Sequence, residues 1–372
     1  MACALWGFSA SAQQTVTIKG KVKFTDKDFK VSVYQREGFG RKVLAETTVG
    51  DDHTYCLEVP VEKAGEATVD CGRWQNVDVW LDDENMDIDF RGMDTAKIKI
   101  KNPPYVYIRA GKKNDLMNLI NFTSYRNYQG MIAASENVYK ANIEDKKVKS
   151  DLFSSFYQAN SENSKAWLRY LVEHNADQPS VLVAIKQLSL EKDSDVINPA
   201  LAHLESLSPE YKQLVADYRQ ADAEAKEKRA RMEEGQPAPE ITFQNEKGKT
   251  VSLKKILKGK ITIIDFWASW CGPCRKEIPN VKKYYAEYKD KGVQFLSISI
   301  DSKKDAWTKA LKEENMGWMQ GWTPDSGKVA MDTYQFNGIP FILMIDKEGK
   351  IYRKHLRGEA IKKAIDECLG NK

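Results

Sequence analysis

The sequence predicts a multi-domain protein with an N-terminal all-β, sandwich-like domain, a central helical region and a C-terminal α/β domain. Three patterns along the 372 residues predict this order. Residues 13–110 alternate apolar and polar side chains in short runs separated by turn residues. Residues 111–234 place apolar side chains at helical spacing. Within residues 235–372, a mostly apolar run typical of a buried strand is followed closely by a helical pattern, as in a sheet covered by helices.

Residues 1–12 are interpreted as a cleaved secretory signal. An apolar run at 2–8 precedes Ala10-Ser11-Ala12, which has the form of a cleavage site, although a basic n-region is missing. The run is too short to span a membrane, and Cys3 lacks the residues that precede a lipoprotein cysteine. We therefore expect a periplasmic or envelope-associated protein with no stable membrane insertion, from which Cys3 is removed with the signal.

The predicted β-domain carries no catalytic constellation, so an interaction or spacer role is expected for it. Its strands are predicted at 15–24, 31–34, 54–59, 77–81, 86–90 and 98–100. Cys56 and Cys71 both fall on strand-like segments. In an oxidising compartment they either pair or stay as two buried thiols, and both possibilities remain open because strand adjacency is not known.

The helical region has predicted helix ends near 175–179 and before Pro209. Its last helix, at about 209–232, becomes almost entirely charged residues and alanine. We expect this helix to lead as a semi-rigid arm into the C-terminal domain at residues 235–237. The methionine and aromatic positions in this region are expected to be core residues.

Composition excludes several classes of function. A net charge of +4 with 30% charged residues, acids interspersed among bases, predicts solvated surfaces and no nucleic-acid partner. Zinc requires four ligands, usually from two close pairs, but only one such pair of cysteines exists and the four histidines are scattered. No metal and no cofactor are expected.

The close pair is Cys271 and Cys274, and its setting predicts a redox-active disulfide. The strand-like run at 261–268 ends just before it, and a helical pattern follows it. Cys271 is therefore expected at a helix N-terminus, where free N–H groups and the helix dipole stabilise a thiolate. The thiolate is the attacking species in thiol–disulfide exchange, and Cys274 lies one turn further on, close enough to close a disulfide.

Residues 235–372 resemble the thioredoxin fold and, more closely, the TlpA/ResA-like thiol–disulfide oxidoreductases of bacterial envelopes. The resemblance rests on residues 235–239, 248–253, 265–274, Glu277 with Pro279, and 338–341. The order of segments before it resembles a β-domain of unknown function that precedes thioredoxin-like modules in Bacteroidetes envelope proteins. The resemblance implies a protein-disulfide reductase. Its implied partners are envelope proteins with disulfides or thiols and a membrane thiol-shuttling reductant.

The resemblance also implies roles for individual residues. Asp265, six positions before Cys271, corresponds to a buried carboxylate that accepts and returns the proton of the second thiol. Glu277 corresponds to an acidic residue that tunes the thiols, although a glutamate in a first helical turn is also favourable by itself. Pro340 is expected to be a cis-proline against the disulfide, after Ile339, whose backbone is expected to pair with an extended substrate.

Three further residues are predicted to bind substrate around the disulfide. Trp270 is expected to form an apolar lip, and Gly272 and Pro273 lie between the two cysteines. The same Gly-Pro dipeptide occurs in strongly reducing thioredoxins. A central insertion is predicted as a helix at about 303–315 and a loop at 317–322, whose aromatic residues form either a partner groove or a small core of their own.

Two functions of other classes remain as alternatives. A thiol peroxidase of the peroxiredoxin-like class would need proline and threonine seven and three positions before the reactive cysteine, where Ile264 and Ala268 stand. A binding protein with an accessory redox module would hold its ligand in the β-domain or the helical region. The presence of both cysteines, Asp265 and the Ile-Pro pair argues against an inactive module.

Overall fold

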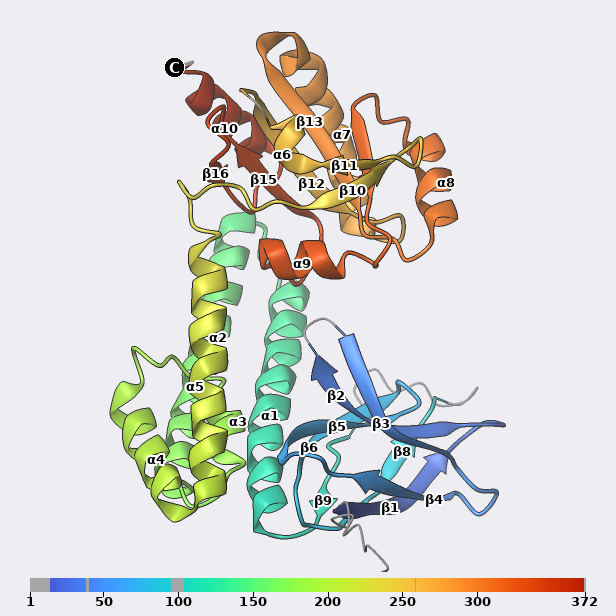
Figure 1. The fold of residues 1–372 in the computed structure, drawn as a ribbon, viewed down its shortest axis with the longest axis vertical. Helices are drawn as coiled ribbons and strands as arrows, with labels where there is room; N and C mark the ends of the chain where they lie inside the picture. Colours follow the sequence, from blue (N-terminus) through green and yellow to red (C-terminus); the bar gives the residue numbers. More distant parts are fainter. Residues whose placement is uncertain (1–13, 38–39, 95–103, 258, 371–372) are drawn as a thin grey trace, which may run out of the picture. The chain divides into compact units, whose positions relative to one another are not determined.

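The computed structural model describes residues 14–37, 40–94, 104–257 and 259–370. The predicted signal segment 1–12 with Cys3 and the predicted strand at 98–100 lie outside these residues. The described residues form two compact units, which meet in the sequence at Arg219 and Gln220 (Figure 1). Among the helices in these ranges, none has both the length and the apolar character needed to span a membrane.

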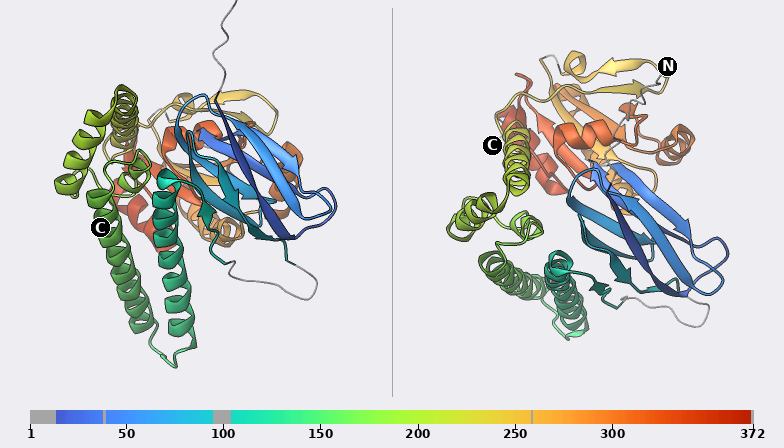
Figure 2. Two further views of the ribbon diagram at one scale, coloured as in Figure 1. Left: turned by 90° about the horizontal axis from the view of Figure 1, so that it is seen from below. Right: turned by 60° about the horizontal axis from the view of Figure 1, so that its bottom comes forward.

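The first unit begins with two β-sheets, as the alternating pattern predicts (Figure 2). One has the order β4-β1-β7-β9, with β8 also paired to β1, and the other has the order β3-β2-β5-β6. Their bounds are β1 (Thr15–Phe24), β2 (Lys30–Glu37), β3 (Gly40–Thr48), β4 (Thr54–Pro60), β5 (Gly65–Cys71), β6 (Gln75–Leu81), β7 (Met86–Ile88), β8 (Phe90–Gly92) and β9 (Ile108–Arg109). A face-to-face sandwich of the two sheets stays a prediction.

Five helices follow the sheets, and the last of them crosses from the first unit into the second. They are α1 (Lys112–Lys140), α2 (Lys146–His174), α3 (Val181–Ile185), α4 (Ser194–Leu207) and α5 (Pro209–Ala230). The long helices α1 and α2 lie side by side and are joined by a short connection (Figure 2). Asp145 caps α2 by accepting from the N–H of Lys147 at 2.7 Å. Pro209 starts α5, where its missing N–H leaves no helical hydrogen bond unmade.

The β and helical segments share one hydrophobic core, to which both sheets and all five helices contribute. Two buried asparagines on α1 connect this helix to the strands. Their side-chain amides make the backbone hydrogen bonds that a neighbouring strand would otherwise make. Asn114 accepts from the N–H of Trp80 at 2.9 Å and donates to its carbonyl at 3.0 Å. Asn118 does the same for Ile108, at 2.9 and 2.7 Å. The side-chain amides therefore satisfy backbone groups that burial would otherwise leave unpaired.

Cys56 and Cys71 are both free thiols in the structure. Cys56 lies on β4 in the five-stranded sheet and is exposed, whereas Cys71 ends β5 in the other sheet and is buried. The possible disulfide between them is not formed, because the two strands belong to different sheets. The alternative of two buried thiols holds for Cys71 alone.

The second unit contains a seven-stranded sheet in the order β11-β10-β14-β13-β12-β15-β16. The strands are β10 (Thr242–Asn245), β11 (Thr250–Ser252), β12 (Ile261–Trp267), β13 (Val293–Ser299), β14 (Met319–Trp322), β15 (Phe341–Ile345) and β16 (Ile351–Arg353). The central strand β12 pairs in parallel with β13 and antiparallel with β15, so the sheet is mixed. Every residue of β12 is buried, which explains why most of its side chains are apolar.

Helices cover both faces of this sheet and create a separate core on each. The helices are α6 (Leu253–Ile256), α7 (Gly272–Tyr288), α8 (Lys304–Glu314), α9 (Lys328–Tyr334) and α10 (Glu359–Leu369). One core combines Ile263 and Trp267 of β12 with α7, α8 and α10. The other combines Ile264 and Phe266 with α6 and α9. Because side chains alternate along a strand, Asp265 lies on the α7 face, between Ile263 and Trp267.

The helix predicted in the insertion is confirmed, whereas the loop predicted after it is wrong. The expected helix at 303–315 is α8. The expected loop at 317–322 instead contains β14, which pairs in parallel with β13. Trp318 and Trp322 are buried in the core that also contains α7. Trp322 Nε1 donates to the carbonyl of Asp301 at 2.6 Å. These two aromatic residues therefore form core, not a partner groove.

The backbones of β1 and β7 lie very close to each other at Gly20, which leaves no room for a side chain. A Cβ added at Gly20 of β1 would lie 1.9 Å from the carbonyl oxygen of Ile88. That oxygen belongs to the backbone and cannot rotate away. We expect Gly20→Ala to lower the free energy of unfolding by about 3 kcal/mol, the upper end of the usual overpacking cost. Urea denaturation followed by circular dichroism measures this loss.

Gly65→Ala is the matched control in the same unit. Its Cβ would meet Gln35 Nε2 only at 4.0 Å, which is ordinary contact. We expect it to change the free energy of unfolding by less than about 0.5 kcal/mol. Equal stabilities of the two variants would contradict the close approach of β1 and β7.

Candidate active site

The two cysteines lie where β12 passes into α7, and the structure joins them in a disulfide. The S–S distance is 2.04 Å and the Cα atoms are 5.2 Å apart. Cys271 is the N-cap residue of α7, and the N–H of Cys274 donates to Cys271 Sγ at 3.2 Å. After reduction, the same N–H and the helix dipole would favour a thiolate at Cys271. The sequence-predicted position at a helix N-terminus is therefore confirmed.

The loop before Cys271 is held by a residue that sequence reasoning missed. Asp301, just after β13, accepts from the backbone N–H of Ser269 at 2.9 Å and from its hydroxyl at 2.6 Å. Arg275 Nε donates to the Ser269 carbonyl at 2.9 Å from the first turn of α7. Asp301 is distant in sequence from the cysteines, so only the pairing of β12 with β13 brings it to the loop.

The predicted substrate-binding residues next to the disulfide are on the surface. Trp270 is 68% exposed, although it is a large aromatic residue. Gly272 and Pro273 are exposed between two cysteines that are themselves buried. Trp270 therefore presents an exposed apolar surface next to the buried disulfide, and its role as a lip for substrate stays a prediction.

Asp265 is buried on the face of β12 that α7 covers, and it is only 5% exposed. Ser297 Oγ donates to Oδ2 at 3.5 Å, and Oδ1 has no hydrogen-bond partner among the described residues. Burial raises the pKa of this carboxyl to about 7; the Arg357 charge opposes the rise and the Glu277 charge adds to it. Near neutral pH, such a group both accepts and returns a proton.

Glu277 makes contacts that hold two helices together. Its Oε1 accepts from the N–H of Gly358 at 2.8 Å and from Asn280 Nδ2 at 3.2 Å. Gly358 is the N-cap residue of α10, so the carboxylate also lies at a helix N-terminus, where a negative charge is favourable. Glu277 thus connects α7 to α10 besides acting on Asp265 through its charge.

Ile339 and Pro340 lie against the disulfide just before β15. Their peptide bond is cis, as the sequence analysis expects. The carbonyl oxygen of Ile339 is 3.7 Å from Cys271 Sγ. The structure therefore brings the Ile339–Pro340 turn to the two cysteines, and Asp265 is buried on the face of β12 that α7 covers.

Arg357 is the second residue that sequence reasoning missed. Its guanidinium Nη2 donates to the carbonyl of Pro340. The only local signal is an arginine immediately before a helix start, where a positive charge is normally disfavoured.

Among the described residues, no group of three or more His, Cys, Asp or Glu side chains is arranged to hold a metal ion.

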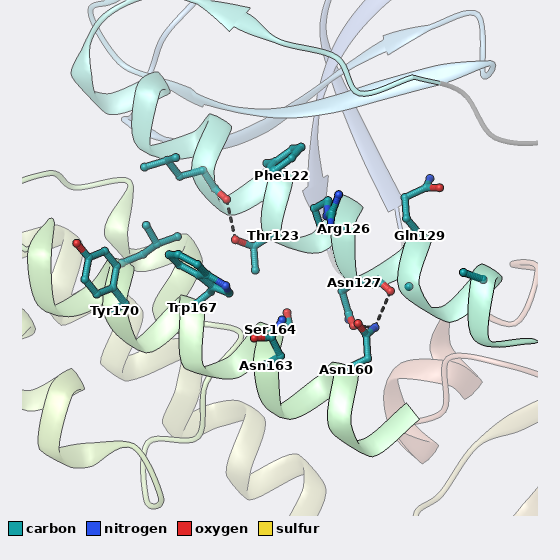
Figure 3. Close-up of a pocket in the computed structure, with 14 residues that line it drawn as sticks. Phe122, Thr123, Arg126, Asn127, Gln129, Asn160, Asn163, Ser164, Trp167 and Tyr170 are labelled. Carbon is teal, nitrogen blue, oxygen red and sulfur yellow. Dashed lines mark hydrogen bonds between the residues drawn. The ribbon is translucent and has the colours of Figure 1, made fainter. Parts of the chain in front are cut away.

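A separate cavity of about 720 Å³ lies between α1 and α2 in the first unit (Figure 3). Phe122, Trp167 and Tyr170 form aromatic walls, and each is about half exposed, so the expectation that the aromatic positions of the helical region are core residues is wrong for these three. Its polar lining is mostly amide and hydroxyl groups, and Arg126 is the one charged residue among the described residues that line it. None of the sequence-predicted site residues belongs to this cavity.

Comparisons with known proteins match the C-terminal part of the chain. Residues 233–367 match the Redoxin family model. The thiol–disulfide oxidoreductase ResA of Bacillus thuringiensis subsp. konkukian is 32% identical over 142 residues, which is 38% of this chain and 80% of that protein. ResA of Bacillus subtilis is 29% identical over 120 residues, 32% of this chain and 65% of that protein.

A solved thioredoxin domain of a thiol–disulfide oxidoreductase from Bacteroides vulgatus is 37% identical to this chain. It covers 37% of this chain and 98% of its own length, with a TM-score of 0.35. The Redoxin match includes the region of both cysteines, and the match to ResA extends over 80% of that relative's length. Through its C-terminal region, the chain therefore belongs to the ResA family of thiol–disulfide oxidoreductases.

Proposed function

We propose that this enzyme is a protein-disulfide reductase of the bacterial envelope. The observation that carries the proposal is the Cys271–Cys274 disulfide at the N-terminus of α7, with the buried carboxyl of Asp265 on the same face of the sheet. The membership in the ResA family supports disulfide chemistry. The interpretation of residues 1–12 as a secretory signal supports the envelope location.

In the proposed reaction, the reduced enzyme donates two electrons to a substrate disulfide. The Cys271 thiolate attacks one substrate sulfur, the substrate S–S bond breaks, and the other sulfur leaves as a thiolate. The product is a mixed disulfide between Cys271 and the substrate. The Cys274 thiol gives its proton to Asp265, and the new thiolate attacks Cys271 Sγ. This second step releases the reduced substrate and re-forms the Cys271–Cys274 disulfide.

The surroundings of the disulfide support these roles. The N–H of Cys274 already points at Cys271 Sγ, so the first cysteine is the one whose thiolate is stabilised. Exposed Trp270 and the backbone of Ile339 lie where an incoming extended substrate would contact the enzyme. A membrane thiol-shuttling protein would then return two electrons to the enzyme disulfide.

The order of attack is tested by trapping. We expect Cys274→Ala to accumulate a mixed disulfide with substrate proteins from envelope extracts, because the resolving thiol is missing. Cys271→Ala should form no such adduct. Non-reducing gel electrophoresis followed by mass spectrometry measures both.

Cys368→Ala is the matched control for trapping, because Cys368 is a partly buried free thiol in α10 of the same unit. It should behave as the parent enzyme. Adducts that form equally well without Cys271 would show that another thiol is the nucleophile.

The direction of the reaction is tested by the redox potential. Gly272 and Pro273 form the dipeptide of strongly reducing thioredoxins, which lie near −270 mV, whereas strong oxidants lie near −120 mV. We expect a midpoint potential in the reducing range. Titration in glutathione or dithiothreitol buffers measures it. A midpoint above about −180 mV, the range of disulfide isomerases, would contradict a reductase.

Ligand binding by the helical part of the first unit is a second candidate function, favoured by the cavity between α1 and α2. Its volume of about 720 Å³ is within the range of small-molecule sites. Aromatic walls favour an apolar body, and Arg126 favours an anionic group. In the described part of the chain, no acidic side chain lines the cavity.

If the cavity binds such a ligand, the negative charge and the apolar part of the ligand should contribute separately to the binding affinity. We expect the anionic dye 1-anilinonaphthalene-8-sulfonate to bind with enhanced fluorescence, and Arg126→Gln to weaken it about tenfold. The uncharged dye N-phenyl-1-naphthylamine should lose little affinity in this variant. Arg219→Gln is the control, because Arg219 pairs with Glu205 outside the cavity. Equal binding of the anionic dye by parent and Arg126→Gln would contradict the site.

A further inference from the structure

We propose that Arg357 is a positioning residue of the redox site, which holds the Pro340 carbonyl beside the disulfide and keeps the carboxyl of Asp265 available as a proton acceptor. The inference rests on the exchange reaction proposed above. It adds to that reaction a residue that neither the motif around the cysteines nor the resemblance to known families indicates.

The contact with the proline turn is the first observation. Arg357 Nη2 donates to the Pro340 carbonyl, and Nη1 donates to the carbonyl of Leu356 at 2.6 Å. The preceding residue of the turn, Ile339, places its carbonyl oxygen 3.7 Å from Cys271 Sγ. The guanidinium therefore holds the backbone segment that lies against the reacting sulfur.

The second observation is that the segment carrying Arg357 is anchored from two sides. Leu356 is buried and its N–H donates to the Ile342 carbonyl of β15 at 3.0 Å. On the other side, the Gly358 N–H donates to Glu277 of α7 at 2.8 Å. Gly358 has a φ of +48°, which suits glycine and forms the turn into α10. Arg357 is thus attached both to the strand after the proline and to the helix that begins at the cysteines.

The third observation is electrostatic. Arg357 precedes the N-cap residue of α10, near a helix N-terminus where the dipole disfavours a cation, so the helix itself does not explain an arginine here. Two charged groups act on Asp265 in opposite senses: Arg357 lowers the pKa of the carboxyl and Glu277 raises it. The neutral group that faces Asp265 is the Ser297 hydroxyl, which itself accepts from Trp318 Nε1 at 2.9 Å.

The balance between these charges affects the rate of the second step. With a pKa of about 7, the Asp265 carboxyl is close to half ionised at neutral pH. Only the ionised form accepts the proton of Cys274. Removal of the positive charge at Arg357 raises the pKa of Asp265 further, so less of the proton acceptor is ionised at a given pH.

The experiment separates the two steps with the aromatic disulfide 5,5′-dithiobis(2-nitrobenzoate) as the substrate. One thionitrobenzoate anion leaves when Cys271 attacks, and a second leaves when Cys274 resolves the mixed disulfide. The rate of the second release is measured between pH 5 and pH 9 with reduced full-length enzyme. We expect it to rise with pH through about 7 in the parent enzyme, and this rise to disappear in Asp265→Asn.

Arg357→Gln keeps a hydrogen-bond donor for the Pro340 carbonyl but removes the charge. We expect its profile to shift to higher pH by about half a pH unit, which slows the second release at pH 7 about twofold, because the Asp265 carboxyl is half ionised there in the parent enzyme. Arg357→Lys keeps the charge and should restore the midpoint of the parent profile. Arg353→Gln is the matched control, because Arg353 pairs with Glu234 and Glu367 and does not act on Asp265.

Failure of this inference is distinguishable from failure of the proposed function. A parent enzyme that releases no second thionitrobenzoate, or whose profile is unchanged in Asp265→Asn, would overturn the proposed exchange steps. A parent profile that depends on Asp265 but is unchanged in Arg357→Gln would overturn the role of Arg357 alone. A shift in Arg357→Lys as large as that in Arg357→Gln would also overturn it, because the charge would then not be the cause.

Discussion

The burial of Asp265 on the face of β12 that α7 covers is the constraint on which the redox site depends. Burying an ionised carboxylate in an apolar core costs free energy. The protonated form is therefore favoured there, and the pKa of Asp265 rises to about 7. The alternation of side chains along β12 puts Asp265 on the same face as Ile263 and Trp267, and α7 covers that face. One strand therefore supplies both the hydrophobic support of the helix and a buried carboxyl on the same face.

Other parts of the second unit fix the positions of the segments around the disulfide. Asp301 at the end of β13 holds the loop before Cys271, and Glu277 connects α7 to the N-terminus of α10. Arg357 then links the start of α10 to the proline turn. These contacts come from four different elements, so the site is held by the sheet and its helices together and not by the cysteine motif alone. Such support is what a reaction between closely placed sulfur atoms needs.

The first unit has a different organisation, in which sheets and helices share one core. Asn114 and Asn118 bond strand backbones from a helix, so the helical part is built onto the sheets and is not a simple linker. Its half-exposed aromatic residues around the cavity between α1 and α2 are unusual for a structural spacer (Figure 3). A redox enzyme that carries a binding element of this kind would couple exchange chemistry to recognition.

Much of this protein is determined by local sequence. The apolar run of β12, the helix after it and the pair Cys271 and Cys274 are consecutive in the chain, and their patterns specify strand, helix start and disulfide without distant contacts. The order of the β and helical segments and the helix of the insertion are predicted for the same reason. Tertiary structure decided the remaining features, because they depend on which strands become neighbours. The pairing of β14 with β13 turns an expected loop into core, and the assignment of β4 and β5 to different sheets keeps Cys56 and Cys71 apart. The packing of α10 against α7 and β15 brings Arg357 to the carbonyl of Pro340.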